Sequence, residues 1–157
     1  MADTLSISMR PASFDEVIGL DATVKAIKKR IDDQGTPHAI MLRGPYGCGK
    51  TTLAHIIARY IQGWDFEGTP QVTEVNGANY RKIDDMRALV ENTSTYALVG
   101  KYQVVILDEA QQVTKDAQQV LLKEFEIPSA PTVWILCTTD PQKINEGLRD
   151  RCWAFEV

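Results

Sequence analysis

Short apolar runs alternate along this chain with segments in which apolar residues recur at helical spacing. The apolar runs are AIML at 39–42, QVTEV at 71–75, QVVIL at 103–107, TVWILC at 132–137 and CWAFEV at 152–157. The helical patterns cover about 50–61, 83–90 and 116–125. Continuous apolar strands separated by helices are typical of a parallel sheet that helices cover on both faces. The pattern therefore predicts a three-layer α/β domain.

A further helical pattern precedes the first apolar run. Val24, Ile27 and Ile31 recur at helical spacing behind Asp21, a residue type that caps helices, so we predict a helix over 21–33. Residues that break helices and strands fall between the elements, at 35–37, 63–70 and 128–131. The sequence shows no repeat or interdomain linker, and its 157 residues suit one domain with its own core. We therefore predict a single domain over 1–157.

Residues 44–51 read GPYGCGKT and match G-x-x-x-x-G-K-[ST], between a predicted strand and a predicted helix. The glycines let the backbone wrap closely around phosphate oxygens, and the following helix presents its positive end. The Lys50 ammonium is predicted to reach the β- and γ-phosphates, and the Thr51 hydroxyl to bind Mg²⁺. A glycine-rich turn without function is the weaker interpretation. The predicted nucleotide contacts are Gly44, Pro45, Tyr46, Gly47, Cys48, Gly49, Lys50, Thr51 and Thr52.

Two carboxylates follow the third apolar run. Asp108 and Glu109 come directly after a predicted buried strand, at the carboxyl edge of the sheet where such folds bind ligands. We expect Asp108 to hold the Mg²⁺ shell and Glu109 to orient and deprotonate the attacking water. Adjacent acids after a strand are often only a solvated loop. Beside a phosphate loop they predict a nucleoside triphosphatase.

The sequence pattern alone does not decide the roles of the other candidate residues. Thr138 follows the fourth apolar run, where its hydroxyl would either face the γ-phosphate or simply be solvated. Arg149 and Arg151 would serve as phosphate-sensing cations, although surface arginines usually have no specific role. Spacing does not choose between the two arginines.

Composition narrows the class of protein further. The net charge of −4 and pI near 5.2 give no global attraction to nucleic acid, so a DNA contact has to be argued locally. Three scattered cysteines without a C-x-x-C pair predict neither a disulfide framework nor a zinc site. No segment has the length and apolarity of a membrane span or a secretory signal. We expect a cytoplasmic protein, or a nuclear one if its source is eukaryotic or viral.

Several motifs together resemble the AAA+ ATPase module of sliding-clamp loaders, such as the bacterial gamma/tau subunit and the small subunits of replication factor C. The resemblance runs from Arg10 to Val157. It rests on RPASFDEVIG at 10–19, LLK at 121–123 with Pro128 beyond, CTTDPQK at 137–143 and LRDRC at 148–152. It implies a parallel five-stranded sheet of order 5-1-4-3-2, with 37–157 as the core and 1–36 completing an adenine site.

The resemblance also assigns roles to residues. Arg10 lies in the segment that resembles the family's adenine-site segment, in which Val17 and Ile18 would contact the base, and this favours ATP. Thr138 matches the family's sensor residue. Arg151 matches the arginine that reaches across a subunit interface into the neighbour's ATP site, so that Arg151, not Arg149, is the predicted arginine finger. Such a finger contributes on the order of 10³-fold in rate.

Two further assignments follow from position within the family. Asn76, at the end of the second apolar run, is predicted to hydrogen-bond Glu109 and hold it unproductive until DNA arrives. Arg81, Lys82 and Lys115 fall where family members track the DNA backbone; solvated surface charge is the competing interpretation. The implied partners are other clamp-loader subunits, a sliding clamp and primer-template DNA, with no membrane.

The sequence departs from the family pattern in several places. Asp150 stands where serine is usual, and Gln111 replaces the familiar histidine or aspartate, but neither change removes a catalytic group. The region 62–70 lacks the cysteine zinc module of the bacterial subunit, so the expected cofactors are ATP and Mg²⁺ without zinc. The chain also ends at Val157, before the family's lid and collar, and we expect weakened nucleotide affinity and poor self-assembly.

The interpretation that the sequence favours is the motor module of a clamp loader. A branch-migration or helicase-loading ATPase of the same superfamily is one alternative. A scaffold subunit that binds nucleotide with little turnover is another, although the intact Lys50, Thr51, Asp108 and Glu109 argue against it. A two-domain helicase would need a second ATPase-like domain, for which 157 residues leave no room.

Overall fold

The computed structural model describes residues 21–62, 72–95, 102–128 and 131–157, which form alternating strands and helices. The strands are β1 (Ala39–Arg43), β2 (Val72–Asn76), β3 (Gln103–Asp108), β4 (Thr132–Thr138) and β5 (Trp153–Glu156). The α-helices are α2 (Asp21–Gln34), α3 (Lys50–Gln62), α4 (Ile83–Thr95), α5 (Lys115–Glu126) and α6 (Glu146–Arg151). The described residues also form the short 3₁₀ helices η2 (Gly77–Asn79), η3 (Ala110–Gln112) and η4 (Pro141–Lys143).

The five strands form one parallel sheet in the order β2-β3-β4-β1-β5. This confirms the predicted order. Strand β4 is buried along its whole length because strands flank it on both sides and helices cover both faces. Strand β2, at the edge, has only half-buried and exposed positions. Since all five strands run the same way, their carboxyl ends meet at one edge, where β3 ends at Asp108 and β4 ends at Thr138.

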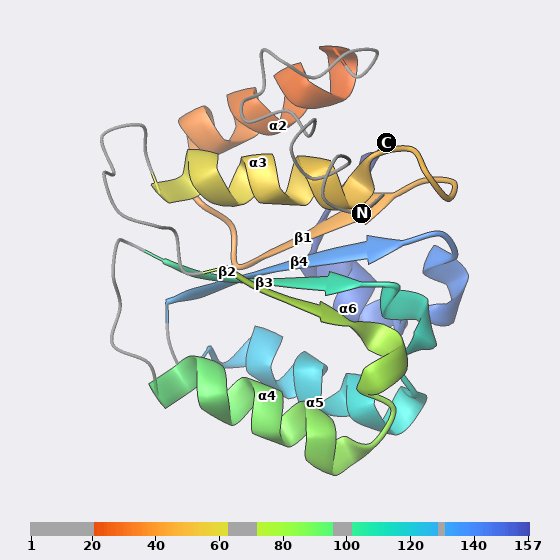
Figure 1. Ribbon diagram of the computed structural model, residues 1–157. Coiled ribbons are helices and arrows are strands. Elements are labelled where there is room, and N and C mark those ends of the chain that lie inside the picture. The colour runs from red at the N-terminus through yellow and green to blue at the C-terminus, as the bar shows by residue number, and fades with distance from the viewer. Residues whose placement is uncertain (1–20, 63–71, 96–101, 129–130) are drawn as a thin grey trace, which may run out of the picture.

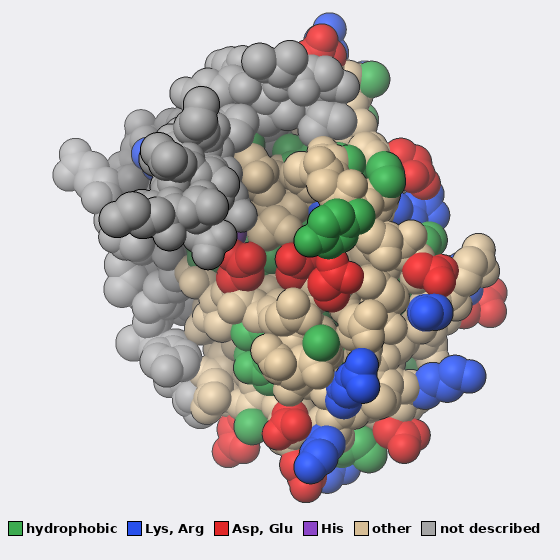
Figure 2. All heavy atoms as spheres, turned by 45° about the vertical axis from the view of Figure 1, so that its right-hand side comes forward, with side chains coloured by type: hydrophobic (Ala, Val, Ile, Leu, Met, Phe, Trp, Pro, Cys, Tyr) green, Lys and Arg blue, Asp and Glu red, His purple; other side chains and the backbone are tan. Residues whose placement is uncertain are grey.

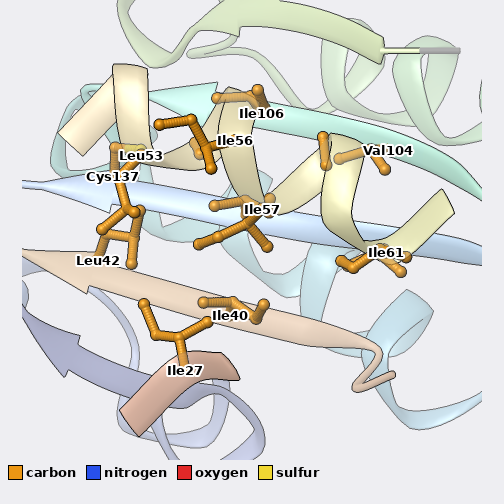
Figure 3. Packing of buried hydrophobic residues seen from close by; sticks show 14 of the residues in the cluster. Ile27, Ile40, Leu42, Leu53, Ile56, Ile57, Ile61, Val104, Ile106 and Cys137 are labelled. Atoms are coloured by element: carbon orange, nitrogen blue, oxygen red, sulfur yellow. The ribbon is translucent and has the colours of Figure 1, made fainter. Parts of the chain in front are cut away.

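Helices α2 and α3 cover one face of the sheet, and α4, α5 and α6 cover the other (Figure 1). Under α3, side chains from α2, α3 and the central strands interdigitate around Ile57, which is fully buried (Figure 3). Burying such a side chain contributes about 1.5–3 kcal/mol. The opposite layer packs Met86, Leu121 and Leu148 against Trp134 of β4. The predicted three-layer architecture is therefore confirmed.

The predicted helix over 21–33 is present as α2, and the helices predicted around 50–61, 83–90 and 116–125 are α3, α4 and α5. Helix α6 has no counterpart among the predicted elements, because six residues give too short a periodic pattern to recognise. Asn145 starts this helix, since its side-chain oxygen accepts a hydrogen bond from the Gly147 N–H at 2.7 Å. Residues 1–20 lie outside the described residues, so the adenine-site assignments of Arg10, Val17 and Ile18 stay predictions.

The three cysteines are free thiols. Burial raises the pKa of Cys152 to about 12 and that of Cys137 further still. Since the thiolate is the reactive form, both thiols are unreactive at neutral pH. The described residues contain no group of three or more His, Cys, Asp and Glu side chains arranged to hold a metal ion. Among the same residues, no helix is long and apolar enough to cross a membrane.

Candidate nucleotide site

The phosphate loop joins β1 to α3, and its backbone has the conformation that the glycine pattern requires. Gly47 and Gly49 adopt φ angles of 78° and 92°, in the left-handed region that disfavours a side chain. A Cβ on Gly44 would lie 2.6 Å from the Val157 carbonyl oxygen, so no larger residue fits there. The Gly44 N–H donates to the Thr138 carbonyl at 3.2 Å, which fixes the loop against the end of β4.

Lys50 is the first residue of α3 and is buried within the loop, with only 7% of the residue exposed. Its ammonium donates to the carbonyl oxygens of Gly44 at 2.9 Å and Pro45 at 2.8 Å, and lies 3.7 Å from the Cys48 sulfur. Within the described part of the chain, Lys50 forms no ion pair. A buried cation whose acceptors are neutral carbonyls favours a bound anion, and this is what a phosphate would supply.

Thr51 and Asp108 bring together the oxygens that a magnesium ion requires. The Thr51 hydroxyl donates to the Asp108 Oδ2 at 3.2 Å, across 57 positions of sequence. The other carboxylate oxygen of Asp108 accepts a hydrogen bond from the Glu109 N–H at 2.9 Å, which orients the carboxylate. Mg²⁺ is usually held by one or two protein oxygens together with phosphate oxygens and waters. The pair fits that ion, with the remaining ligands coming from nucleotide and water.

Glu109 occupies a strained turn immediately after β3. Its φ and ψ angles are 51° and 44°, and among the non-glycine residues described it alone has a positive φ. A left-handed conformation costs a residue with a Cβ about 1–2 kcal/mol. The turn is enclosed on one side by Gly77, where a Cβ would lie 2.4 Å from the Glu109 carbonyl oxygen. Strain of this kind is concentrated at functional sites.

Gln111 links Glu109 to Thr138 through both ends of its carboxamide. Its nitrogen donates to the Glu109 Oε2 at 2.5 Å, and its oxygen accepts a hydrogen bond from the Thr138 hydroxyl at 3.0 Å. Thr138 is completely buried, and its hydroxyl also accepts from the Asp140 N–H at 3.0 Å. Sequence reasoning missed this role, since Gln111 stood out only as a departure from a family pattern. Its position two residues after Glu109 was the available signal.

The phosphate loop and the two acids after β3 line a cavity of about 480 Å³, which lies within the range of small-molecule sites. It is lined by Tyr46, Gly47, Gly49, Lys50, Thr51, Thr52, Asp108 and Glu109. Tyr46 is 88% exposed at its rim. On the face that carries the carboxyl ends of the strands, acidic side chains gather in the middle, and Lys and Arg side chains lie below them (Figure 2). The loop and the acids predicted from sequence therefore meet in one place.

Comparison with known proteins identifies the family. Residues 40–156 match the ATPase family associated with various cellular activities (AAA). The chain belongs to this family. The predicted AAA fold is thereby confirmed, and the family to which the chain belongs is one of ATPases.

Relatives of this AAA chain include two kinds of replication protein. The replication factor C small subunit of Staphylothermus marinus is 33% identical over 148 residues, which cover 93% of this chain and 44% of the relative. The DNA polymerase III subunit tau/gamma of Haemophilus influenzae is 27% identical over 170 residues, covering 98% of this chain and 25% of the relative. The chain thus spans less than half the length of these curated relatives.

Solved structures of similar fold include a Thermotoga maritima RuvB Holliday junction branch migration motor. It matches with a TM-score of 0.75 and 29% identity, over 94% of this chain and 48% of the RuvB chain. A gamma-subunit-related protein of DNA polymerase III from the same organism matches with a TM-score of 0.66 over 85% of this chain and 45% of that chain. At 18% identity the second likeness shows the fold alone.

The two arginines near the C-terminus of this AAA chain have different environments. Arg149 is part-buried, and its Nε donates to the Ile144 carbonyl at 3.1 Å, which ties it into its own subunit. Arg151 lies at the end of α6, where its guanidinium donates to the Gly147 carbonyl at 3.0 Å and pairs with Glu126 at 3.0 Å. An exposed guanidinium held by an exposed carboxylate is free to exchange partners.

The remaining predicted positions lie at the β2 edge and on the α4 and α5 layer. The Asn76 side chain accepts a hydrogen bond from the Ala78 N–H at 2.9 Å and so caps η2, while Asn76 stands opposite Asp108 in the sheet register. Its contact with Glu109 stays a prediction. Arg81 donates to Gln112 at 3.1 Å. A cavity of about 430 Å³ is lined by Arg81, Lys82, Ile83, Asp84, Arg87, Thr114 and Asp116.

Proposed function

We propose that this chain is the ATP-binding and ATP-hydrolysing module of a clamp loader, which places a sliding clamp on primed DNA. The observation that carries the catalytic part is the meeting of Lys50, Thr51, Asp108 and Glu109 around one cavity. The clamp-loader part is supported by the relatives, because the replication factor C and DNA polymerase III subunits align with 93–98% of this chain.

Each residue at the cavity has a chemical task in this proposal. The Lys50 ammonium leaves the loop carbonyls to donate to the β- and γ-phosphate oxygens. Thr51 and Asp108 would hold a Mg²⁺ ion, which would neutralise phosphate charge when bound. Glu109 takes a proton from a water whose oxygen attacks the γ-phosphorus, and the bond from that phosphorus to the bridging oxygen breaks to release ADP. Thr138 donates to the γ-phosphate.

The remaining roles require an assembly. Arg151 leaves Glu126 and reaches into the ATP site of a neighbouring subunit, where it stabilises the charge that develops during phosphoryl transfer. Arg81, Lys82 and Lys115 contact the backbone of primer-template DNA on the α4 and α5 layer, and they add affinity that depends on salt but not on sequence. The partners are therefore other loader subunits, a clamp and DNA.

One alternative is a branch-migration ATPase. The likeness to the RuvB branch migration motor, with a TM-score of 0.75 at 29% identity, favours it. Since both functions use the same nucleotide chemistry, the cavity does not distinguish them. The nucleic acid that stimulates turnover does.

The experiment that tests the proposal is steady-state ATP hydrolysis by the full 157-residue chain. The chain is measured alone, with primed DNA, and with candidate clamp and partner subunits, and a four-way junction serves as the alternative DNA. Low turnover alone that rises with primed DNA and the partner subunits supports the clamp loader. Stimulation only by the junction supports the branch-migration alternative. Absence of both ATP binding and turnover in every mixture contradicts the nucleotide site itself.

A further inference from the structure

Gln111 lies in the candidate site but has no role in the nucleotide chemistry described above. It lies in η3, half-buried between the ends of β3 and β4. Its carboxamide nitrogen is 2.5 Å from the Glu109 Oε2, and its carboxamide oxygen is 3.0 Å from the Thr138 Oγ1. A single side chain thus joins the residue assigned to the water with the residue assigned to the γ-phosphate.

The direction of these hydrogen bonds follows from the chemistry of the three groups. An ionised carboxylate only accepts, so the side of Gln111 that faces Glu109 has to be the NH₂ group. The carbonyl oxygen then faces Thr138, whose hydroxyl has one proton to give. That hydroxyl already accepts from the Asp140 N–H at 3.0 Å, so its proton points to Gln111. The chain of donors therefore runs from Asp140 through Thr138 and Gln111 to Glu109.

Both ends of this chain are held by the fold. Thr138 ends the buried strand β4, and its carbonyl accepts from the phosphate loop at Gly44. At the other end, the backbone of η3 closes on Glu109, because the Gln112 N–H donates to the Glu109 carbonyl at 2.9 Å. Ala110, between Glu109 and Gln111, is only 3% exposed, so the turn has little room to move. Gln111 therefore spans two fixed points.

We propose that Gln111 is a positioning residue that couples Thr138 to Glu109. Its amide N–H occupies Oε2 of Glu109 and turns Oε1 towards the attacking water. The Thr138 hydroxyl holds the amide in this orientation as long as its proton goes to Gln111. When a γ-phosphate oxygen accepts that proton instead, Gln111 loses one of its two anchors, and the change is transmitted to the catalytic carboxylate. The inference rests on the roles of Glu109 and Thr138 in the proposed function.

The isosteric change Gln111→Glu tests the donor directly, because the new side chain donates to Glu109 only when it carries a proton. We expect Gln111→Ala and Gln111→Glu each to lower kcat about 10- to 100-fold at pH 8, the size typical of a lost supporting contact, with KM for ATP changed less than about twofold. As the pH falls towards 6, Gln111→Glu should recover relative to wild type, whereas Gln111→Ala should not. Gln119→Glu, the same change at an exposed position of α5, is the matched control.

Other charged groups near this turn are common to all the variants. They are Asp108 and Glu109 after β3, Lys50 on α3, Asp140 after β4 and Arg81 against Gln112. The ratio of variant to wild-type kcat at each pH therefore isolates the group at position 111. Equal ratios for Gln111→Glu and Gln119→Glu at every pH would overturn the proposal. All these rates are measured with primed DNA and the partner subunits present, and absence of wild-type turnover in every such mixture would instead contradict the proposed function.

A double-mutant cycle with Thr138→Val tests the coupling. The valine keeps the shape of the buried side chain and removes the hydroxyl. If Gln111 acts through Thr138, the double variant should be about as slow as the slower single variant, and effects that multiply would overturn the coupling. Thermal unfolding of each variant identifies a folding defect. If Thr138→Val does not fold, the pH dependence of Gln111→Glu decides the proposal alone.

Discussion

The phosphate end of the site and the basic positions around it differ in how the protein holds them. Lys50 and Thr138 are 7% and 0% exposed, and hydrogen bonds with backbone groups fix both side chains. Among the described residues, Arg151 pairs with a partly exposed carboxylate and a helix carbonyl, and Lys82 and Lys115 are exposed. The residues at the phosphate end form the first group and are arranged within one chain. The exposed basic residues form the second group and gain a specific partner only in an assembly. The two groups should therefore respond differently to mutation, to salt and to partner subunits.

The largest effect that would separate the two groups is expected from Arg151→Ala. In the assembled complex this change should lower turnover about 10³-fold, because a guanidinium supplied across an interface stabilises the charge on the transferring phosphoryl group. Nucleotide binding by the lone chain should be unchanged, and a fluorescent ATP analogue measures it. Arg59→Ala, which removes an exposed arginine at the far end of α3, is the control. Equal turnover of wild type and Arg151→Ala in the complex would place the arginine finger elsewhere.

At the phosphate end, where Glu109 is half-buried, Glu109→Gln should lower turnover about 10²-fold while ATP binding is retained. The amide preserves the shape of the side chain but cannot take a proton from water. Unlike Arg151→Ala, this variant should show the same fractional loss in the lone chain and in the complex, if the lone chain turns over at all. Single-turnover measurements with labelled ATP check this. A loss that appears only in the complex would mean that Glu109 becomes catalytic only beside a neighbour.

The meeting of Lys50, Thr51 and Asp108 could be predicted from the sequence, because their spacing is set by backbone geometry. A glycine loop between a strand and a helix leaves one place for Lys50 and Thr51, and a buried strand that ends in two acids brings Asp108 to that place. The sheet order was predictable only by resemblance, since strand periodicity does not say which strands are neighbours. Gln111 was not predicted as a link, because its two contacts join positions 2 and 27 residues away in different elements.

The roles of the exposed basic residues are harder to predict from the sequence, and the reason is physical. Arg81 and Lys82 precede α4 and Lys115 begins α5, all at exposed positions where charged residues are common in most proteins, so their spacing has no unique interpretation. The structure adds that Arg81 contacts Gln112 in η3, next to the turn that carries Glu109. This contact connects the basic layer to the nucleotide site and is the kind of information that a linear pattern does not hold.

A smaller effect is expected from Lys82→Ala and Lys115→Ala. If both side chains contact DNA phosphates, each change should weaken binding of primed DNA and reduce the slope of log affinity against log salt by about 1. ATP turnover without DNA should be unaltered. Fluorescence anisotropy with labelled primer-template over a range of salt concentrations measures the slope. An unchanged slope in both variants would mean that these lysines are solvated surface charge. They would then not belong to a DNA-binding surface.

The smallest effect concerns Thr114, which lies between the two groups. Its hydroxyl caps α5 by accepting from the Ala117 N–H at 3.3 Å, and it also donates to the Arg81 carbonyl, so it joins the start of α5 to the segment before α4. Thr114→Ala should lower the free energy of unfolding by about 1 kcal/mol, the usual cost of a lost cap. For a chain of this size that lowers Tm by about 2–4 °C. Scanning calorimetry measures this, with Gln119→Ala as the control on the same helix.

Because the Thr114 cap supports the segment that carries Arg81 and Lys82 rather than the phosphate loop, DNA affinity should fall slightly while affinity for ATP stays constant. An equal loss of DNA affinity and ATP affinity would show that the phosphate end and the exposed basic residues depend on the same contacts. The two groups would then not be held independently.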